Sequence, residues 1–540
     1  MLSVVSGFVL GAFLEPRWQD AVEPAQVLAG LVQYPVPTPT SVYSTSTWTL
    51  AHQIAAALLS AGFNEYAVSI FFSGVLGAVS FAALASVLDA SGTRGQSMLA
   101  GVLAVYWAGA TFPTAIMGAQ TTYGVLGASQ TLLVIGLSAG GRLRTAGVVA
   151  GLLLCVHPAW AALSLPVLLA LGWWSPTSPF GTRQWRVGLG LGLLVSLASA
   201  VVHVLMVGVN ALPGIAAFSG RDLAMISGWD VHRAPIELWS WEIARVVLLV
   251  GLVSVVWRRA TDGALRHVAL ATLLVTATGL VLAPATWAPD AVPGLLTSLM
   301  PSRVFALAPL STGVLALGLV MRVAGARWGS LLLVLLVAWP WTGLRGDDAA
   351  WWLAGLAAVA THPRCRGWLP ATAMSRTVPV VLSVVATLLA VATLTEGPMV
   401  RAETVAVDAV LLQARRGSGL VLTADSIHLV QLRTRRPVLL DGAALDGYPY
   451  APASFALAHP ILEAVYGIDV MTMRPDVPEG RLTGPHVEAV WTSRTQAEWQ
   501  VLAAQFHFVA IVTPSDWTLQ LPPEVFSRDL ALWRIPGVPQ

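Results

Sequence analysis

Apolar blocks of 13 to 28 residues recur along positions 1–395 and alternate with polar stretches. A helix needs about 20 apolar residues to cross the roughly 30 Å of bilayer hydrocarbon, so this pattern predicts a polytopic α-helical membrane protein. Several blocks are shorter than that, and their bounds are therefore approximate. The predicted spans are 1–14, 66–88, 98–112, 122–140, 146–173, 187–209, 244–257, 267–286, 303–321, 329–343, 349–361 and 378–395.

The connecting loops differ in charge, and this difference predicts the topology. One set of loops holds 13 Arg and only two acidic residues, Asp89 and Asp262. Loops rich in Arg remain in the cytoplasm of a bacterial inner membrane protein. These loops are 89–97, 141–145, 174–186, 258–266, 322–328 and 362–377. The N-terminus is then expected in the cytoplasm, and the long loops 15–65, 210–243 and 287–302 are expected on the outer face.

One apolar block, residues 146–173, is flanked on both sides by loops predicted to be cytoplasmic. It must therefore enter the membrane and return. His157-Pro158 lies near its middle, where proline removes a backbone donor and breaks a helix. We expect two short half-spans or a re-entrant hairpin, about 13 crossings in total, and a C-terminal domain outside the cytoplasm.

Composition separates the chain into two predicted domains. Hydrophobic residues make up 56% of the sequence and charged residues only 11%, which excludes an ordinary soluble enzyme. Residues 396–540, however, hold 11 Arg and 15 acidic residues, so we expect a transmembrane domain over 1–395 and a soluble domain over 396–540. The net charge of +2 and the lack of a basic run argue against a nucleic-acid partner. The short cytoplasmic loops leave no room for a nucleotide-binding domain.

Three carboxylates follow the first predicted span, in the outer loop 15–65. They are Glu15, Asp20 and Glu23. Carboxylates just above a membrane surface can accept a proton from a hydroxyl nucleophile or hold a divalent cation. The alternative is that they are simply acidic residues tolerated on the outer face. The first outer loop is therefore a candidate catalytic segment, and a divalent metal is a candidate cofactor.

A second group of candidates combines cations, carboxylates and histidines. Arginine can bind a phosphate with two hydrogen bonds, and histidine can donate to it or act as an acid. The alternatives are ion pairs within loop 210–243 for its members, snorkelling to lipid phosphate for the Arg that begins a span, and a hydrogen bond between helices for the intramembrane His. The candidates are Arg221, Asp222, Asp230, His232 and Arg233 in loop 210–243, Arg303 at the start of a span, and His157 in the broken block.

The tail alternates strand-like and helix-like stretches, which predicts a small α/β layer domain. Asp425 and Asp441 follow predicted strands, where functional sites are common, but helix capping is the favoured role for both. The predicted strands are 420–423, 437–440, 508–513 and 530–535, and the predicted helices are 426–432 and 497–505.

In these features the chain resembles the GT-C superfamily of integral-membrane glycosyltransferases. The likeness rests on the acidic stretch after the first span, the run from Ala25 to Tyr34-Pro35, the many spans with short cytoplasmic loops, and the outer α/β domain. The family typically has adjacent acids in its first outer loop, whereas here Glu15, Asp20 and Glu23 are spread out. Apart from this departure, the likeness in architecture covers nearly the whole chain.

The resemblance implies transfer of a sugar from a polyprenyl-phosphate donor, with membrane lipid and the lipid-linked sugar as partners. Asp20, or Glu15 or Glu23 in its place, would activate the acceptor hydroxyl. Cationic side chains would neutralise the phosphate leaving group. Those implied are Arg221, His232, Arg233 and Arg303.

Two other classes of function remain open from the sequence. A transporter or flippase for a lipid-linked or amphipathic substrate is favoured by the broken block 146–173. The near absence of carboxylates within the spans argues against ion-coupled transport. A non-catalytic component of envelope polysaccharide assembly would tolerate substitution of the charged loop residues.

Overall fold

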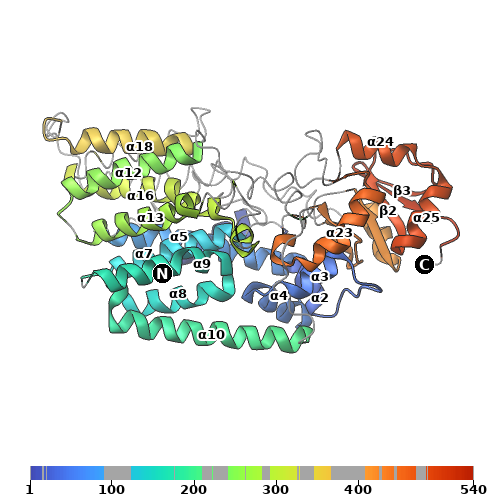
Figure 1. Ribbon diagram of the computed structural model, residues 1–540, viewed down its shortest axis with the longest axis horizontal. Helices are drawn as coiled ribbons and strands as arrows, with labels where there is room; N and C mark the ends of the chain where they lie inside the picture. The colour runs from blue at the N-terminus through green and yellow to red at the C-terminus, as the bar shows by residue number, and fades with distance from the viewer. Residues whose placement is uncertain are drawn as a thin grey trace.

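The computed structural model shows a predominantly helical chain with a small sheet near its C-terminal end (Figure 1). The predicted spans 98–112, 329–343 and 378–395 lie outside the residues that it describes. The described residues are 2–14, 18–19, 21–90, 123–175, 177–208, 222, 241–261, 263–282, 287, 292, 294–324, 328, 346–365, 408–424, 429–442, 445, 447–469, 482 and 484–538.

Every predicted span within the described residues overlaps a helix. Four helical segments are long and apolar enough to cross a membrane: Glu65–Ala90, Arg183–Val207, Gly263–Leu282 and Pro301–Leu319. The helices of this part are α1 (Leu2–Val9) with the π-helix η1 (Leu10–Leu14), α5 (Glu65–Ala90), α7 (Tyr123–Ala139), α8 (Leu143–Val156), α9 (Pro158–Trp174), the 3₁₀-helix η2 (Pro179–Gly181), α10 (Arg183–Val207), α12 (Trp241–Arg259), α13 (Gly263–Leu282), α15 (Gly294–Ser298), the 3₁₀-helix η5 (Pro301–Ala306), α16 (Leu307–Leu319), the π-helix η6 (Val320–Ala324) and α18 (Gly346–Thr361). The membrane-like helical class is therefore confirmed.

Helices α8 and α10 approach each other through glycines spaced four residues apart. A Cβ atom on Gly147 would lie 2.1 Å from the carbonyl oxygen of Trp185, and one on Gly188 would lie 2.1 Å from that of Arg144. Such spacing lets two backbones touch, as small residues do in membrane helix pairs. The contacts advance in the same direction along both helices, so α8 and α10 are parallel.

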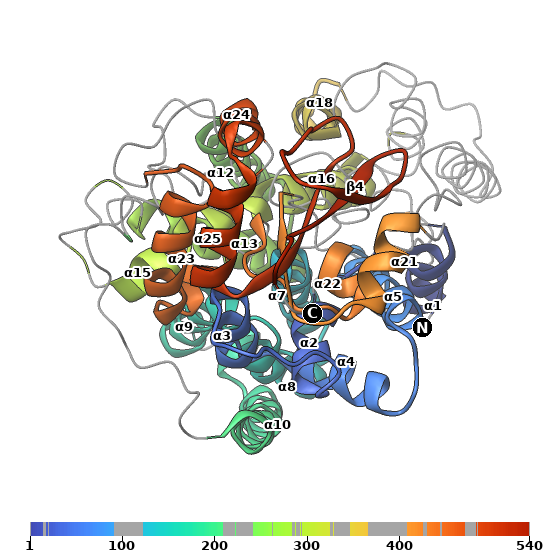
Figure 2. The ribbon, with the colours of Figure 1, turned by 90° about the vertical axis from the view of Figure 1, so that its right-hand side faces the viewer.

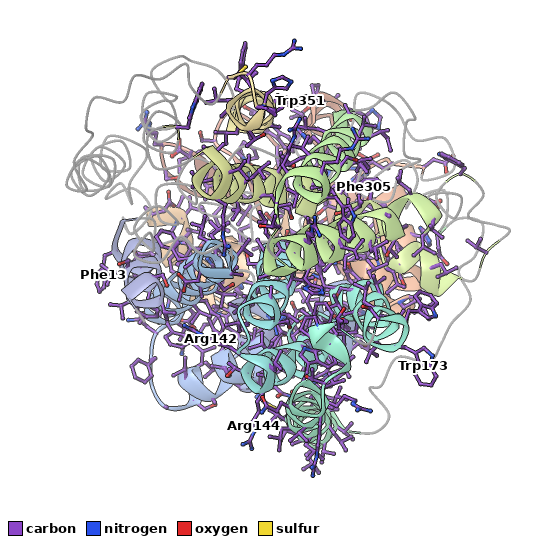
Figure 3. The ribbon with its side chains drawn as sticks, turned by 90° about the vertical axis from the view of Figure 1, so that its left-hand side faces the viewer. Phe13, Arg142, Arg144, Trp173, Phe305 and Trp351 are labelled. Carbon is purple, nitrogen blue, oxygen red and sulfur yellow. The ribbon has the colours of Figure 1, made fainter. Side chains whose placement is uncertain are left out.

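The parallel pairing explains the broken block. Because α10 begins beside the start of α8, the intervening α9 must run back, and α8 and α9 form a helical hairpin. The break falls at His157, whose imidazole caps α9 by accepting from the backbone N–H of Trp160. Figure 3 views the end away from the C-terminal domain, and Arg142 and Arg144 lie at this end.

Helices α12, α13, α16 and α18 form a second group. It packs against α5, α7 and α9 through one shared hydrophobic core. Side chains of η5 such as Phe305 lie in this core (Figure 3). By contrast, much of α10 is exposed, including Leu194 and Leu205. Trp173 and Trp174 at the end of α9 are exposed as well. Apolar surface of this extent fits contact with lipid.

The segment predicted as the first outer loop is helical where the structure describes it, and its helices contact both the bundle and the C-terminal domain (Figures 1 and 2). Its helices are α2 (Val22–Leu28), α3 (Pro39–Ser46) and α4 (Leu50–Ser60). Thr38 caps α3 with a reciprocal capping box, and Thr49 caps α4. Helix α3 packs against α23 of the C-terminal domain, and α2 packs against α22.

The C-terminal domain is α/β, as predicted. Its sheet has the strand order β1-β2-β4-β3, in which β1 and β2 are parallel and the other pairs are antiparallel. Residues 437–440 were expected to form a strand but contribute only one parallel bridge, Val421 to Val438. The elements are α21 (Ala409–Arg416), β1 (Leu420–Thr423), α22 (Leu429–Thr434), the 3₁₀-helix η9 (Tyr448–Tyr450), α23 (Ala453–Ala464), α24 (Pro485–Ser493), α25 (Gln496–Phe506), β2 (Phe508–Pro514), β3 (Pro523–Phe526) and β4 (Leu530–Arg534).

Candidate functional site

The structure describes four of the predicted site residues, and all four are buried. They are Glu23, His157, Asp222 and Arg303, with exposed fractions of 3%, 8%, 8% and 8%. Buried charged groups are costly unless they are paired, so each of them needs an explanation. The other candidates, Glu15, Asp20, Arg221, Asp230, His232 and Arg233, lie outside the described residues.

Arg303 and His157 come together although 146 residues separate them. Arg303 lies in η5, and its Nη1 donates to Nε2 of His157 over 3.0 Å. The break between α8 and α9 exposes the imidazole at the end of both helices, where Arg303 reaches it. Two candidates that the sequence placed in different spans thus form one polar centre.

The C-terminal domain completes this centre with Tyr450. Nη2 of Arg303 donates to the Tyr450 hydroxyl and to Sδ of Met300, both at 2.8 Å, and the guanidinium carbon lies 6.0 Å from the centre of the tyrosine ring. A thioether is a weak acceptor. Met300 also holds a left-handed backbone conformation, with φ of +50°, which is uncommon for a residue other than glycine. Within the described part of the chain, no carboxylate pairs with Arg303.

The polar centre has more hydrogen-bond donors than acceptors. His157 faces two donors, Arg303 at Nε2 and the backbone N–H of Trp160 at Nδ1, the latter at 3.4 Å. A neutral imidazole has only one acceptor nitrogen, so it cannot satisfy both. The N-terminus of α9 adds the positive end of a helix dipole. A buried cation, surplus donors and a helix N-terminus are together suited to an anion such as a phosphate.

Glu23 lies in a second buried polar group, between α2 and the C-terminal domain. Its backbone carbonyl accepts from Nε2 of Gln431 over 3.3 Å, and Oε1 of Gln431 accepts from the Tyr34 hydroxyl. Burial raises the pKa of Tyr34 well above its ordinary value, and the negative charge of Glu23 adds to the shift. The phenol therefore stays neutral near the carboxylate and can serve as a hydrogen-bond donor.

Tyr448 extends the same group into η9. Burial raises its pKa well above the ordinary value, and the charges of Asp441 and Glu23 raise it further. Asp441 was favoured as a helix cap in the sequence, and its charge here acts on buried phenols. Two carboxylates, one from each domain, thus influence the same tyrosine.

Asp222 meets the C-terminal domain across a long sequence distance. Its Oδ1 lies 2.7 Å from Nε2 of His459 in α23. The ring of Phe455 stacks on the imidazole at 5.9 Å with an angle of 17°. The predicted alternative, a pair between Arg221 and Asp222, involves a residue outside the described part.

One segment of the C-terminal domain, residues 448–459, joins these three groups. Tyr448 faces the Glu23 group, Tyr450 contacts Arg303, and His459 contacts Asp222. Ring contacts link Tyr448 to Phe455 and Phe455 to His459. Sequence reasoning missed this segment, because its only signal was an aromatic Tyr-Pro-Tyr run before an ordinary apolar helix.

A divalent metal was a candidate cofactor from the sequence. Within the described ranges, no three His, Cys, Asp or Glu side chains gather closely enough to hold a metal ion. The carboxylates proposed from the sequence, Glu15 and Asp20, lie outside those ranges.

No protein-family model matches the chain, and no curated protein matches it. What is established is therefore the architecture: apolar helices of membrane-spanning length and a small α/β domain joined to them through buried polar contacts.

Proposed function

We propose that this protein is a membrane glycosyltransferase that moves a sugar from a polyprenyl-phosphate donor to an acceptor on the outer face of the membrane. The observation that carries the proposal is the buried guanidinium of Arg303, which no carboxylate among the described residues neutralises. A cation held in this way is suited to an anionic ligand. A phosphate at the head of an apolar lipid chain is such a ligand, and membrane helices surround the site.

Each step of the transfer has a candidate group. The acceptor hydroxyl oxygen forms a bond to the anomeric carbon while the bond from that carbon to the phosphate oxygen breaks. The departing polyprenyl phosphate gains negative charge, which Arg303, Tyr450 and the N-terminus of α9 would stabilise. The resemblance to GT-C enzymes implies that a carboxylate of the first outer loop, Asp20 or its neighbours Glu15 and Glu23, accepts the hydroxyl proton.

The proposed topology has about 13 crossings, a cytoplasmic N-terminus and an extracytoplasmic C-terminal domain in a bacterial inner membrane. It is supported by the parallel pairing of α8 and α10, which brings four arginines to one end of that helix pair. These arginines are Arg142, Arg144, Arg183 and Arg186. Arg303, Tyr450 and the first outer loop would then lie toward the outer face.

The test is incubation of the purified protein with a panel of polyprenyl-phosphate sugars, with release of polyprenyl phosphate as the measured quantity. We expect Arg303→Met to reduce release by about 10²- to 10³-fold, as for loss of a charge-stabilising group, and Asp20→Asn to abolish it. Arg528→Ala is the matched control, because the Arg528 side chain is 85% exposed. No release with any donor, together with passage of a lipid-linked sugar across proteoliposomes, would establish the transporter alternative instead.

A further inference from the structure

Asp222 and His459 form a buried pair in which a carboxylate faces an imidazole. The two side chains come from the second outer loop and from α23, 237 residues apart, and both are about nine-tenths buried. An ionised aspartate can only accept hydrogen bonds, so the imidazole nitrogen facing it, Nε2, carries a proton. In the neutral ring, the lone pair is then on Nδ1.

The second ring nitrogen, Nδ1, lacks a partner within the described part of the chain. Among the described residues, Nδ1 of His459 is a buried atom without a hydrogen-bond donor. Leaving a buried polar atom unsatisfied is costly. The ring is also fixed in orientation, by Asp222 at one edge and by Phe455 stacked on its face. A bound hydroxyl group would supply the missing donor.

A carboxylate that orients an imidazole and leaves its other nitrogen free is the arrangement of a general base. We propose that Asp222 and His459 form a proton-accepting dyad, with Nδ1 of His459 as the atom that receives the proton of the acceptor hydroxyl. This inference rests on the proposed function and assigns the base to His459, whereas the GT-C resemblance assigns it to a first-loop carboxylate. With His459 as the base, Asp20→Asn should leave transfer measurable, and His459→Gln should have the larger effect.

The step balances without another reactant. As the acceptor oxygen bonds to the anomeric carbon, its proton moves to Nδ1, and the electron pair of the breaking bond goes to the phosphate oxygen. The imidazolium that forms is stabilised by the charge of Asp222. It returns the proton to water after the polyprenyl phosphate leaves.

The surroundings of His459 make a pH profile informative. Imidazoles commonly titrate between about pH 5 and 8, whereas carboxylates titrate near pH 4. Among the described residues, Asp222 is the charged side chain in direct contact with the ring. The titratable side chains on α23 and on the elements packed against it are Glu463, Tyr43 of α3, and Tyr448 and Tyr450 of η9.

The experiment measures transfer by the full-length protein with the donor that the panel identifies. His459→Gln keeps an N–H for Asp222 but removes the basic nitrogen. We expect it to lower kcat by about 10²- to 10⁴-fold with little change in the affinity for polyprenyl phosphate. The acid limb of the wild-type kcat profile should disappear with it, because the base must be unprotonated to act. His459→Ala should regain activity when imidazole is added.

A second histidine of the same domain provides the control. His486→Gln removes another imidazole of the same domain, whose Nε2 hydrogen-bonds with the Gly467 carbonyl, and should leave kcat unchanged. A wild type that transfers sugar while His459→Gln transfers equally well, or a wild-type rate that falls only near pH 4, overturns the dyad alone. A wild type that transfers no sugar overturns the proposed function and the dyad together.

Discussion

The contact between α8 and α10 and the contact between the bundle and the C-terminal domain are built on opposite principles. The first is made by glycines whose backbones touch. The second is made by buried polar and charged groups such as Arg303 with Tyr450 and Asp222 with His459. Close apolar packing stabilises without a desolvation penalty, whereas buried charges contribute little net stability. The difference fits the proposed function, in which the helix pair stabilises the fold and the junction holds the site.

Arg303→Met has the largest expected effect on this comparison. If the cation is retained for an anionic ligand, its loss should raise the barrier to transfer by about 3–4 kcal/mol. The thermal stability of the ligand-free protein should stay the same or rise, because well-packed apolar replacements of buried charges are often neutral or stabilising. Differential scanning fluorimetry on the detergent-solubilised protein measures the second effect. A large loss of stability would show instead that Arg303 serves the fold.

Gly188→Leu tests the glycine contact between α8 and α10. The added side chain meets the carbonyl oxygen of Arg144, which belongs to a helix backbone and cannot move aside. We expect a loss of about 2–3 kcal/mol of stability, as for overpacking in a core, measured by thermal unfolding. Gly190→Leu is the matched control on the same helix, since no atom lies within 4 Å of its Cβ position. Equal effects of the two substitutions would contradict the role of the glycine contact.

Local elements could be predicted from the sequence, whereas the contact between α8 and α10 and the junction could not. A break at His157-Pro158 follows from the chemistry of proline, and strands such as 420–423 and 508–513 follow from short apolar runs. These are local signals. The partners of Arg303 and Asp222 lie 147 and 237 residues away, and one sequence contains no information about which distant side chains meet. Tyr450 and His459 were missed for that reason.

Arg435→Met tests a junction contact outside the proposed site. Nε of Arg435 lies 2.6 Å from Oε1 of Glu65, at the boundary between α22 and α5, with 35% and 12% of the side chains exposed. We expect a loss of about 1–2 kcal/mol in unfolding free energy, as for a charged hydrogen bond in a partly buried place, with transfer activity unchanged. A double-mutant cycle with Glu65→Gln isolates the pair. The same cycle on the exposed pair Arg528 and Asp529 should give a coupling near zero.

The smallest expected effect concerns an exposed polar contact that belongs to neither region. At the start of α25, the Glu498 carboxylate accepts from the backbone N–H and the hydroxyl of Thr495, at 2.7 and 2.8 Å. These hydrogen bonds hold the pKa of Glu498 below its ordinary value. A carboxyl whose pKa is lower in the folded state stabilises the fold above its unfolded pKa, and this contribution is lost as the pH falls through the folded value.

The wild-type protein should therefore lose a small part of its stability below about pH 4.5, near the ordinary value for a glutamate. Glu498→Gln should remove that part of the pH dependence, because glutamine can still complete the capping box without titrating. Thermal unfolding from pH 6 to pH 3.5 measures the difference between the two proteins. Unchanged pH dependence in the variant would mean that the acid response arises elsewhere, with the buried carboxylates Glu23, Asp222 and Asp441 at the junction as the groups to substitute next.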